Sequence, residues 1–238
     1  MKKTKAQTEK SEEKQIITSQ QTVKPWVRGM AILLLTGVSG WLIMEMEILA
    51  GRMLAPFVGN DIYTTWGSVI GVFLLSLSVG YMLGGRFSRV KRSREILGLG
   101  LIVSGLWLMA TPLALEPICY WLEDMGLGVR MVGLGASVIL FAAPTILLGT
   151  VSPTAIQWLT REVRESGLKA GMVLAFSTAA SFAGCLVTAW YLTSLSLRRT
   201  VWISGGSLSL VGCILLVVGL IKSNSQEPVE SNTHEASH

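Results

Sequence analysis

The chain has 238 residues, enough for one domain, and its 20 basic and 15 acidic residues give a formal net charge of +5 at pH 7. Half of the residues are hydrophobic and only 15% are charged, against about 25% in a typical soluble protein. The surplus of apolar residues must face something other than water, which argues against a soluble enzyme, a nucleic-acid-binding module and a disulfide scaffold, and for a membrane protein.

Long uncharged runs predict six transmembrane helices. Five runs of 20 to 30 residues contain no Asp, Glu, Lys or Arg, and about 20 apolar residues cross a hydrocarbon core about 30 Å thick. Another run begins at Gly29 and continues past Glu45 and Glu47. Helices are expected because backbone groups in lipid must be satisfied within the segment. The predicted spans are 29–51, 65–85, 96–115, 131–151, 169–193 and 200–221.

The basic residues predict the orientation of these helices. Sixteen of the 20 lie before the first helix, in the loops that join helices two to three and four to five, and after the sixth helix. The positive-inside rule therefore places both termini in the cytoplasm, with the acidic loop from Glu116 to Met125 outside. Residues 1–28 and 222–238 are polar tails, expected to be disordered, around a transmembrane domain at 29–221.

Neither a metal, a cofactor nor a catalytic residue is expected. Both histidines, His234 and His238, lie in the C-terminal tail, and Cys119, Cys185 and Cys213 show no CxxC spacing. The sequence holds no Ser–His–Asp set, HExxH motif or P-loop.

The second and fifth predicted helices resemble each other at a shift of 104 residues. Small residues recur at the same spacings in both, at Gly67 and Gly171, Gly71 and Ala175, and Gly80 and Gly184. One interpretation is a three-helix unit repeated twice with inverted orientation, as in half of a major facilitator transporter. The alternative is that small residues recur in any packed membrane helix.

The predicted cytoplasmic loop after the second helix is rich in glycine and arginine. It reads Gly84-Gly85-Arg86-Phe87-Ser88-Arg89-Val90-Lys91-Arg92. This loop resembles the one at that position in the major facilitator fold, although it lacks the usual acidic residue. A plain positive-inside loop is the alternative. Its basic residues are candidate contacts for a soluble partner: Arg86, Arg89, Lys91, Arg92 and Arg94.

Charged residues interrupt the end of the first predicted helix. Glu45 and Arg52 are seven residues apart and share a helix face, whereas Glu47 points roughly the other way. A charge at mid-bilayer costs about 2.5–3.5 kcal/mol on insertion scales, so such residues are seldom found there without a partner. Tyr63 and Trp66 follow at the predicted outer interface, the depth that these residue types favour.

Two interpretations of this charged segment stay open. In the functional one, Glu45, Glu47 and Asp61 form an acidic cluster that attracts a cation. In the structural one, Glu45 or Glu47 pairs with Arg52 and fixes a re-entrant or interfacial turn, where Pro56 ends the helix or starts the turn. Three carboxylates against one arginine leave surplus negative charge.

The segment from Glu45 to Gly85 combines charges, a proline, glycines and aromatic residues at set spacings. These are Glu47, Arg52, Leu54-Ala55-Pro56, Gly59, Tyr63, Trp66, Val69-Ile70-Gly71 and Gly80-Tyr81-x-Leu83-Gly84-Gly85. The pattern resembles the membrane domain of the fused transporter/spermidine synthase-like proteins, which join a multi-helix membrane part to a cytosolic aminopropyltransferase-like domain. The turn Leu148-Gly149-x-x-x-Pro153 and the helix from Gly171 to Gly184 look similar too. Asp61 departs from the pattern, since a serine is expected there.

The resemblance implies a bacterial cytoplasmic (inner) membrane protein and a link to polyamines. In the family, a soluble domain with a glycine-rich nucleotide loop and acidic amine-binding residues follows the last helix. This chain ends 17 residues after the sixth predicted helix, whereas a βαβ unit needs about 30 residues or more. We therefore expect that the polypeptide is not by itself an aminopropyltransferase.

Three functions follow as alternatives. The first is a non-catalytic integral membrane subunit that anchors or serves a separate soluble spermidine synthase-like partner. The second is a small transporter of polyamines or other cations that acts as a homodimer. The third is a structural membrane assembly protein. Carboxylates at Glu45, Glu47 and Asp61 favour the second, but no other predicted helix holds an acidic residue in its interior.

Overall fold

The structure is a computed structural model that describes residues 25–58, 62–90, 92–160 and 166–224. These residues form helices and turns, with no strand among them. Six helices are long and apolar enough to cross a membrane, at Gly29–Val58, Thr65–Phe87, Ser93–Asp124, Val129–Leu159, Ser166–Ser194 and Leu197–Ile221. The all-α architecture and the six helices fit the multi-pass membrane protein that the sequence predicts.

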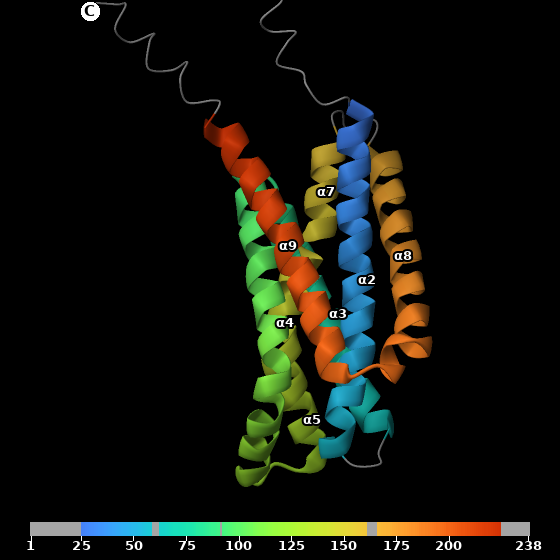
Figure 1. The fold of residues 1–238 in the computed structure, drawn as a ribbon, viewed down its shortest axis with the longest axis vertical. Helices are drawn as coiled ribbons and strands as arrows, with labels where there is room; N and C mark the ends of the chain where they lie inside the picture. Colours follow the sequence, from blue (N-terminus) through green and yellow to red (C-terminus); the bar gives the residue numbers. More distant parts are fainter. Residues whose placement is uncertain (1–24, 59–61, 91, 161–165, 225–238) are drawn as a thin grey trace, which may run out of the picture.

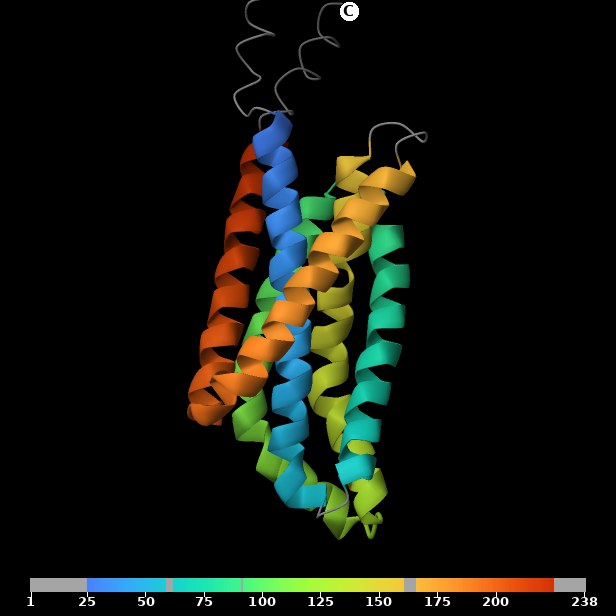
Figure 2. The ribbon, with the colours of Figure 1, turned by 90° about the vertical axis from the view of Figure 1, so that its right-hand side faces the viewer.

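The six spans form one elongated bundle (Figures 1 and 2). The first three are α2 (Pro25–Val58), α3 (Ile62–Phe87) and α4 (Ser93–Asp124). The fourth is built from α5 (Val129–Ser137), a π-helical segment η1 (Val138–Ala142), α6 (Ala143–Gly149) and α7 (Val151–Leu159). The last two are α8 (Ser166–Trp190), followed by the short η3 (Leu192–Ser194), and α9 (Leu197–Asn224). The start of α2 and the end of α9 lie at the same end of the bundle.

The helices extend beyond the predicted spans, and the prediction that residues 116–124 belong to a loop is wrong. Residues 116–124 continue α4. Leu115, Cys119 and Leu122 are buried at helical spacing, so an apolar stripe holds this turn against the bundle. Glu116 and Glu123 lie on the exposed face of the same helix. These two charged residues therefore lie on an exposed face of the helix and do not indicate where it ends.

Both terminal helices extend into the segments that were predicted to be tails. Helix α2 begins at Pro25, inside the predicted tail 1–28, and α9 continues to Asn224. Proline suits the first turn of a helix because the amide hydrogen that it lacks has no partner there. The remaining parts of both tails, 1–24 and 225–238, lie outside the described residues.

Facing glycines bring α4 and α9 into backbone contact. A methyl group at Gly98 would lie 2.8 Å from the amide nitrogen of Leu216, and one at Gly212 would lie 2.8 Å from the carbonyl oxygen of Gly98. Two turns away, Gly105 and Gly205 face each other in the same manner. Each helix therefore carries two glycines seven residues apart, on one face, that leave no room for a side chain.

Two further helix pairs are also in backbone contact at glycines. Between α2 and α8, a methyl group at Gly40 would lie 2.6 Å from the Ser177 carbonyl oxygen, and one at Gly184 would lie 2.9 Å from that of Trp41. Between α3 and the fourth span, a methyl group at Gly80 would lie 2.5 Å from the Ile146 carbonyl oxygen. The bundle therefore consists of three close pairs: α4 with α9, α2 with α8, and α3 with the fourth span.

The π-helical segment joins the fourth span to α4. Pro144 has no amide hydrogen for the carbonyl group of Leu140, four residues earlier. The indole Nε1–H of Trp107 on α4 donates to that carbonyl oxygen at 3.0 Å, and Ser104 Oγ donates to the Pro144 carbonyl oxygen at 3.2 Å. Side chains of α4 thus satisfy backbone groups that lipid would leave without a partner.

The two adjacent glycines of α9 provide a matched test of the α4–α9 contact. A methyl group at Gly205 would lie 2.7 Å from the Gly105 carbonyl oxygen, whereas one at Gly206 meets nothing within 4 Å. We predict that Gly205→Ala lowers the unfolding free energy by about 1–3 kcal/mol, as overpacked sites do. Gly206→Ala should leave it nearly unchanged. Unfolding in mild detergent measures both, and equal stabilities would contradict the close contact.

Candidate functional site

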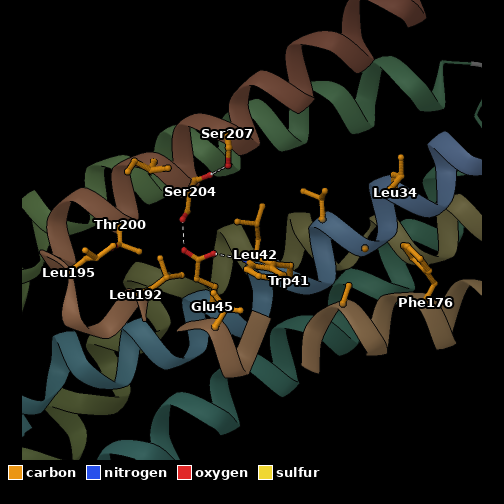
Figure 3. A pocket seen from close by; sticks show the side chains of 15 residues that line it. Leu34, Trp41, Leu42, Glu45, Phe176, Leu192, Leu195, Thr200, Ser204 and Ser207 are labelled. Atoms are coloured by element: carbon orange, nitrogen blue, oxygen red, sulfur yellow. Dashed lines mark hydrogen bonds between the residues drawn. The ribbon is translucent and has the colours of Figure 1, made fainter. Parts of the chain in front are cut away.

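Glu45 is a carboxylate buried near the middle of the first span. Its side chain lies on α2 and is 3% exposed. One carboxylate oxygen, Oε2, accepts a hydrogen bond of 3.0 Å from Nε1–H of Trp41, one helical turn earlier. The other, Oε1, accepts a hydrogen bond from Ser204 Oγ on α9 (Figure 3). Glu45 therefore has two neutral donors, of which Ser204 connects α2 to α9.

No cationic side chain balances Glu45 in the described part of the chain. The ion pair found there joins Arg92 to Glu95, with 3.8 Å between Nε and Oε2. An isolated charge in a membrane interior costs about 2.5–3.5 kcal/mol on insertion scales, and the alternative is to bind a proton or a cation. The described residues contain no group of three or more His, Cys, Asp or Glu side chains that could hold a metal ion. The site thus suits a proton, or a cation that one carboxylate can hold.

Glu45 opens onto a cavity of ≈ 560 Å³. Helix α2 forms its floor, and α8 and α9 stand on either side of that helix (Figures 1 and 3). Besides Glu45, the polar side chains that line it are Trp41, Thr200, Ser204 and Ser207, and the rest of the lining is apolar. Ser207 Oγ donates to the Ser204 carbonyl oxygen at 2.9 Å. The cavity is an apolar groove with one acidic group.

Arg52 does not reach either glutamate. Its guanidinium donates to the carbonyl oxygen of Thr193, in the short helix η3. Carbonyl groups at the end of a helix lack intrahelical partners and attract cationic donors. Glu47, two residues after Glu45, is partly exposed, and neither glutamate shares an ion pair with Arg52. The predicted ion pair is therefore replaced by a contact that joins α2 to η3.

The aromatic residues of the predicted outer turn have separate positions. Tyr63 is 91% exposed. The Trp66 ring packs on Gly51, where a methyl group would lie 3.0 Å from Cη2. Trp66 is thus a packing contact between α2 and α3. Asp61 lies outside the described residues, so the predicted acidic cluster is represented here by Glu45 and Glu47.

The basic loop between α3 and α4 is attached to α7. Ser88 is hydrogen-bonded to the Gln157 side chain at 2.5 Å, and Trp158 Nε1–H donates to Ser93 Oγ at 3.1 Å. The Arg94 guanidinium lies 5.7 Å from the centre of the Trp158 ring. These contacts fix the loop at the end of the bundle where α2 begins.

The other basic residues of this loop differ from Arg94, which is half-buried. Arg86, Arg89 and Arg92 are exposed, and Arg92, which precedes the first residue of α4, also pairs with Glu95 in that helix. Lys91 lies outside the described residues. The loop therefore presents at least three guanidinium groups on a fixed backbone.

Sequence reasoning missed the partners of Glu45. The i, i+4 spacing of Trp41 and Glu45 was a usable signal, since such residues are neighbours on a helix. Ser204 could not be found in this way, because one serine in an apolar helix does not reveal what it faces. Thr188 on α8 was missed as well: its Oγ1 is buried and has no hydrogen-bond partner among the residues that the structure describes.

No protein-family model, curated protein sequence or solved structure matches this chain. Relationship to the fused transporter/spermidine synthase-like family therefore stays an expectation.

Double-mutant cycles test which side chains interact with the acidic residues. Glu45→Leu and Ser204→Ala should show a coupling energy of about 0.5–3 kcal/mol, since directly bonded residues are not additive. Glu47→Gln and Arg52→Gln should be additive within about 0.5 kcal/mol. The measurement is the unfolding free energy in mild detergent. Strong coupling of Glu47 to Arg52, with none between Glu45 and Ser204, would contradict the arrangement.

Proposed function

We propose that this protein is a membrane transporter of cations in which Glu45 is the binding carboxylate. The observation that carries the proposal is a buried carboxylate near the middle of a span, hydrogen-bonded by neutral donors and without a cationic partner among the described residues. Ionisable residues inside a membrane mark ion or substrate pathways by default. The adjoining cavity of ≈ 560 Å³ has the size of a small-molecule site.

Support for an inverted 3+3 repeat comes from the helix pairs. If spans one to three are exchanged with spans four to six, the α2–α8 pair is exchanged with the α3–fourth-span pair, and the α4–α9 pair is exchanged with itself. The facing glycines obey the same exchange, since Gly98 and Gly205, and Gly105 and Gly212, are each 107 residues apart. Such repeats are common in transporters that bind substrate near the midplane.

The groove lies where the proposed repeat is not symmetric. Exchange of the halves relates the contact of α4 with the fourth span to the contact of α9 with α2. Helix α4 packs along α5, η1 and α6 with hydrogen bonds from Trp107 and Ser104. Helix α9 meets α2 through Ser204 and Glu45, and the groove occupies the remaining space. In a transport cycle, the contact of α9 with α2 would close while the contact of α4 with the fourth span opens. Glu45 would then be accessible from each side of the membrane in turn.

The proposal includes both termini on the cytoplasmic side of a bacterial membrane, and a homodimer of twelve helices. The charge distribution supports this orientation, because the exposed arginines of the α3–α4 loop lie at the same end as the start of α2. The dimer is supported by α3, where a methyl group added at Gly67 or Gly71 would meet no atom of another helix within 4 Å. Small residues of this kind allow close helix contacts in membranes.

A second candidate function is a membrane subunit for a soluble spermidine synthase-like partner. The observation in its favour is the α3–α4 loop, which is held rigidly on α7 and exposes Arg86, Arg89 and Arg92. A partner with an acidic surface would fit it. Co-purification of an aminopropyltransferase-like protein from native membranes would favour this candidate over the transporter.

Uptake into liposomes tests the transporter directly. Liposomes containing the purified chain should accumulate at least one labelled amine from a panel that carries one to three positive charges. Glu45→Gln should reduce uptake at least tenfold, because the variant cannot supply the negative charge. Glu47→Gln is the matched control and should keep most of it. No uptake by wild type, or equal uptake by all three proteins, would contradict the proposal.

A further inference from the structure

We propose that the groove between α8 and α9 binds a singly charged organic cation with an apolar body, and not a polyamine. The inference rests on the proposed function, because it names the substrate class of the same site. The cationic group would lie at Glu45, and the apolar body would extend along α2 towards Leu34 and Phe176.

The charge of the ligand follows from the carboxylates that line the groove. Among the described residues that line the cavity, Glu45 is the one with an acidic side chain. Glu47 is two residues further along α2 and is not among the lining residues. A polyamine would leave additional ammonium groups against apolar side chains, where each unpaired charge is strongly disfavoured. One carboxylate matches one positive charge.

The apolar body follows from the rest of the lining. Leu34, Val38 and Leu42 form a stripe on the floor, and Phe176 and Ile203 contribute from α8 and α9. Along α2, the lining from Leu34 to Glu45 covers 11 residue steps, which is about 16 Å at 1.5 Å per residue. A compact inorganic cation would leave this length empty. An elongated or bulky hydrophobic group fills it.

The position of Trp41 adds a second feature that favours an organic cation. Its ring lines the groove, and its Nε1–H donates to the Glu45 carboxylate. An aromatic face next to a carboxylate is a favourable environment for an organic cation, since the π-system attracts the positive charge. Thr200 and Ser207, on the turns of α9 before and after Ser204, can accept hydrogen bonds from an amine in the groove.

The position of the groove also indicates how the ligand enters. Helices α8 and α9 stand on opposite sides of α2 and diverge towards the end of the bundle where α2 begins (Figure 1). All three helices are long and apolar enough to cross a membrane, so in the proposed arrangement the groove would face the hydrocarbon region. A cation with an apolar body partitions into that region, whereas a polyamine remains in water. Lateral entry from the membrane therefore fits the same ligand class.

Binding of labelled tetraphenylphosphonium to the full chain, purified in mild detergent, tests this inference. We expect saturable binding to wild type, at least tenfold weaker binding to Glu45→Gln, and unchanged binding to the matched control Glu47→Gln. Spermidine at the same concentration should not displace the probe. Melting curves establish that each variant is folded.

A second variant keeps the test decisive if Glu45→Gln unfolds. Val38→Trp fills the apolar part of the groove and leaves the carboxylate in place, so it should weaken tetraphenylphosphonium binding at least tenfold. Equal binding by wild type and Val38→Trp would overturn the inference. So would spermidine binding at Glu45 that is tighter than that of the phosphonium ion, although cation transport would then stand. Failure of uptake together with Glu45-dependent phosphonium binding would reject the transporter and retain the binding site.

Discussion

The bundle depends on backbone contact between helices in a solvent that supplies no hydrophobic attraction between them. Lipid tails are as apolar as leucine side chains, so membrane helices associate through close packing and hydrogen bonds. Glycines provide that contact in all three helix pairs, with Gly98 and Gly105 facing Gly212 and Gly205 as the most regular example. Where such contact is absent, between α9 and the first half of α2, the side chains leave a groove.

The groove explains how a carboxylate can be placed inside the bundle. Glu45 is enclosed by Trp41 and Ser204, which satisfy its oxygens without neutralising it. Neutral donors of this kind preserve the affinity of the carboxylate for an external cation, whereas an arginine beside it would occupy the site permanently. Arg52 is held away by the Thr193 carbonyl oxygen. Glu45 and Arg52, both on α2, are thus kept apart by their separate hydrogen-bond partners.

Much of the fold was predictable from the sequence, because uncharged runs of 20 to 30 residues fit few structures other than transmembrane helices. The end of α4 was not predictable in this way. Glu116 and Glu123 lie on the exposed face of a helix that continues to Asp124. Glu45 was found as a candidate because a charge in an apolar run is rare. Its partner Ser204 lies 159 residues away in the sequence, and no local pattern encodes such a tertiary contact.

Infrared difference spectroscopy of the carboxyl groups tests most directly whether Glu45 binds the cation. The spectrum of the protein is recorded with and without tetraphenylphosphonium, and the difference reports each carboxyl group whose bonding changes. The account predicts one carboxyl signal that is present in wild type and in Glu47→Gln and missing in Glu45→Gln. Saturable binding of the cation with no carboxyl signal, or with a signal that persists in Glu45→Gln, would contradict it.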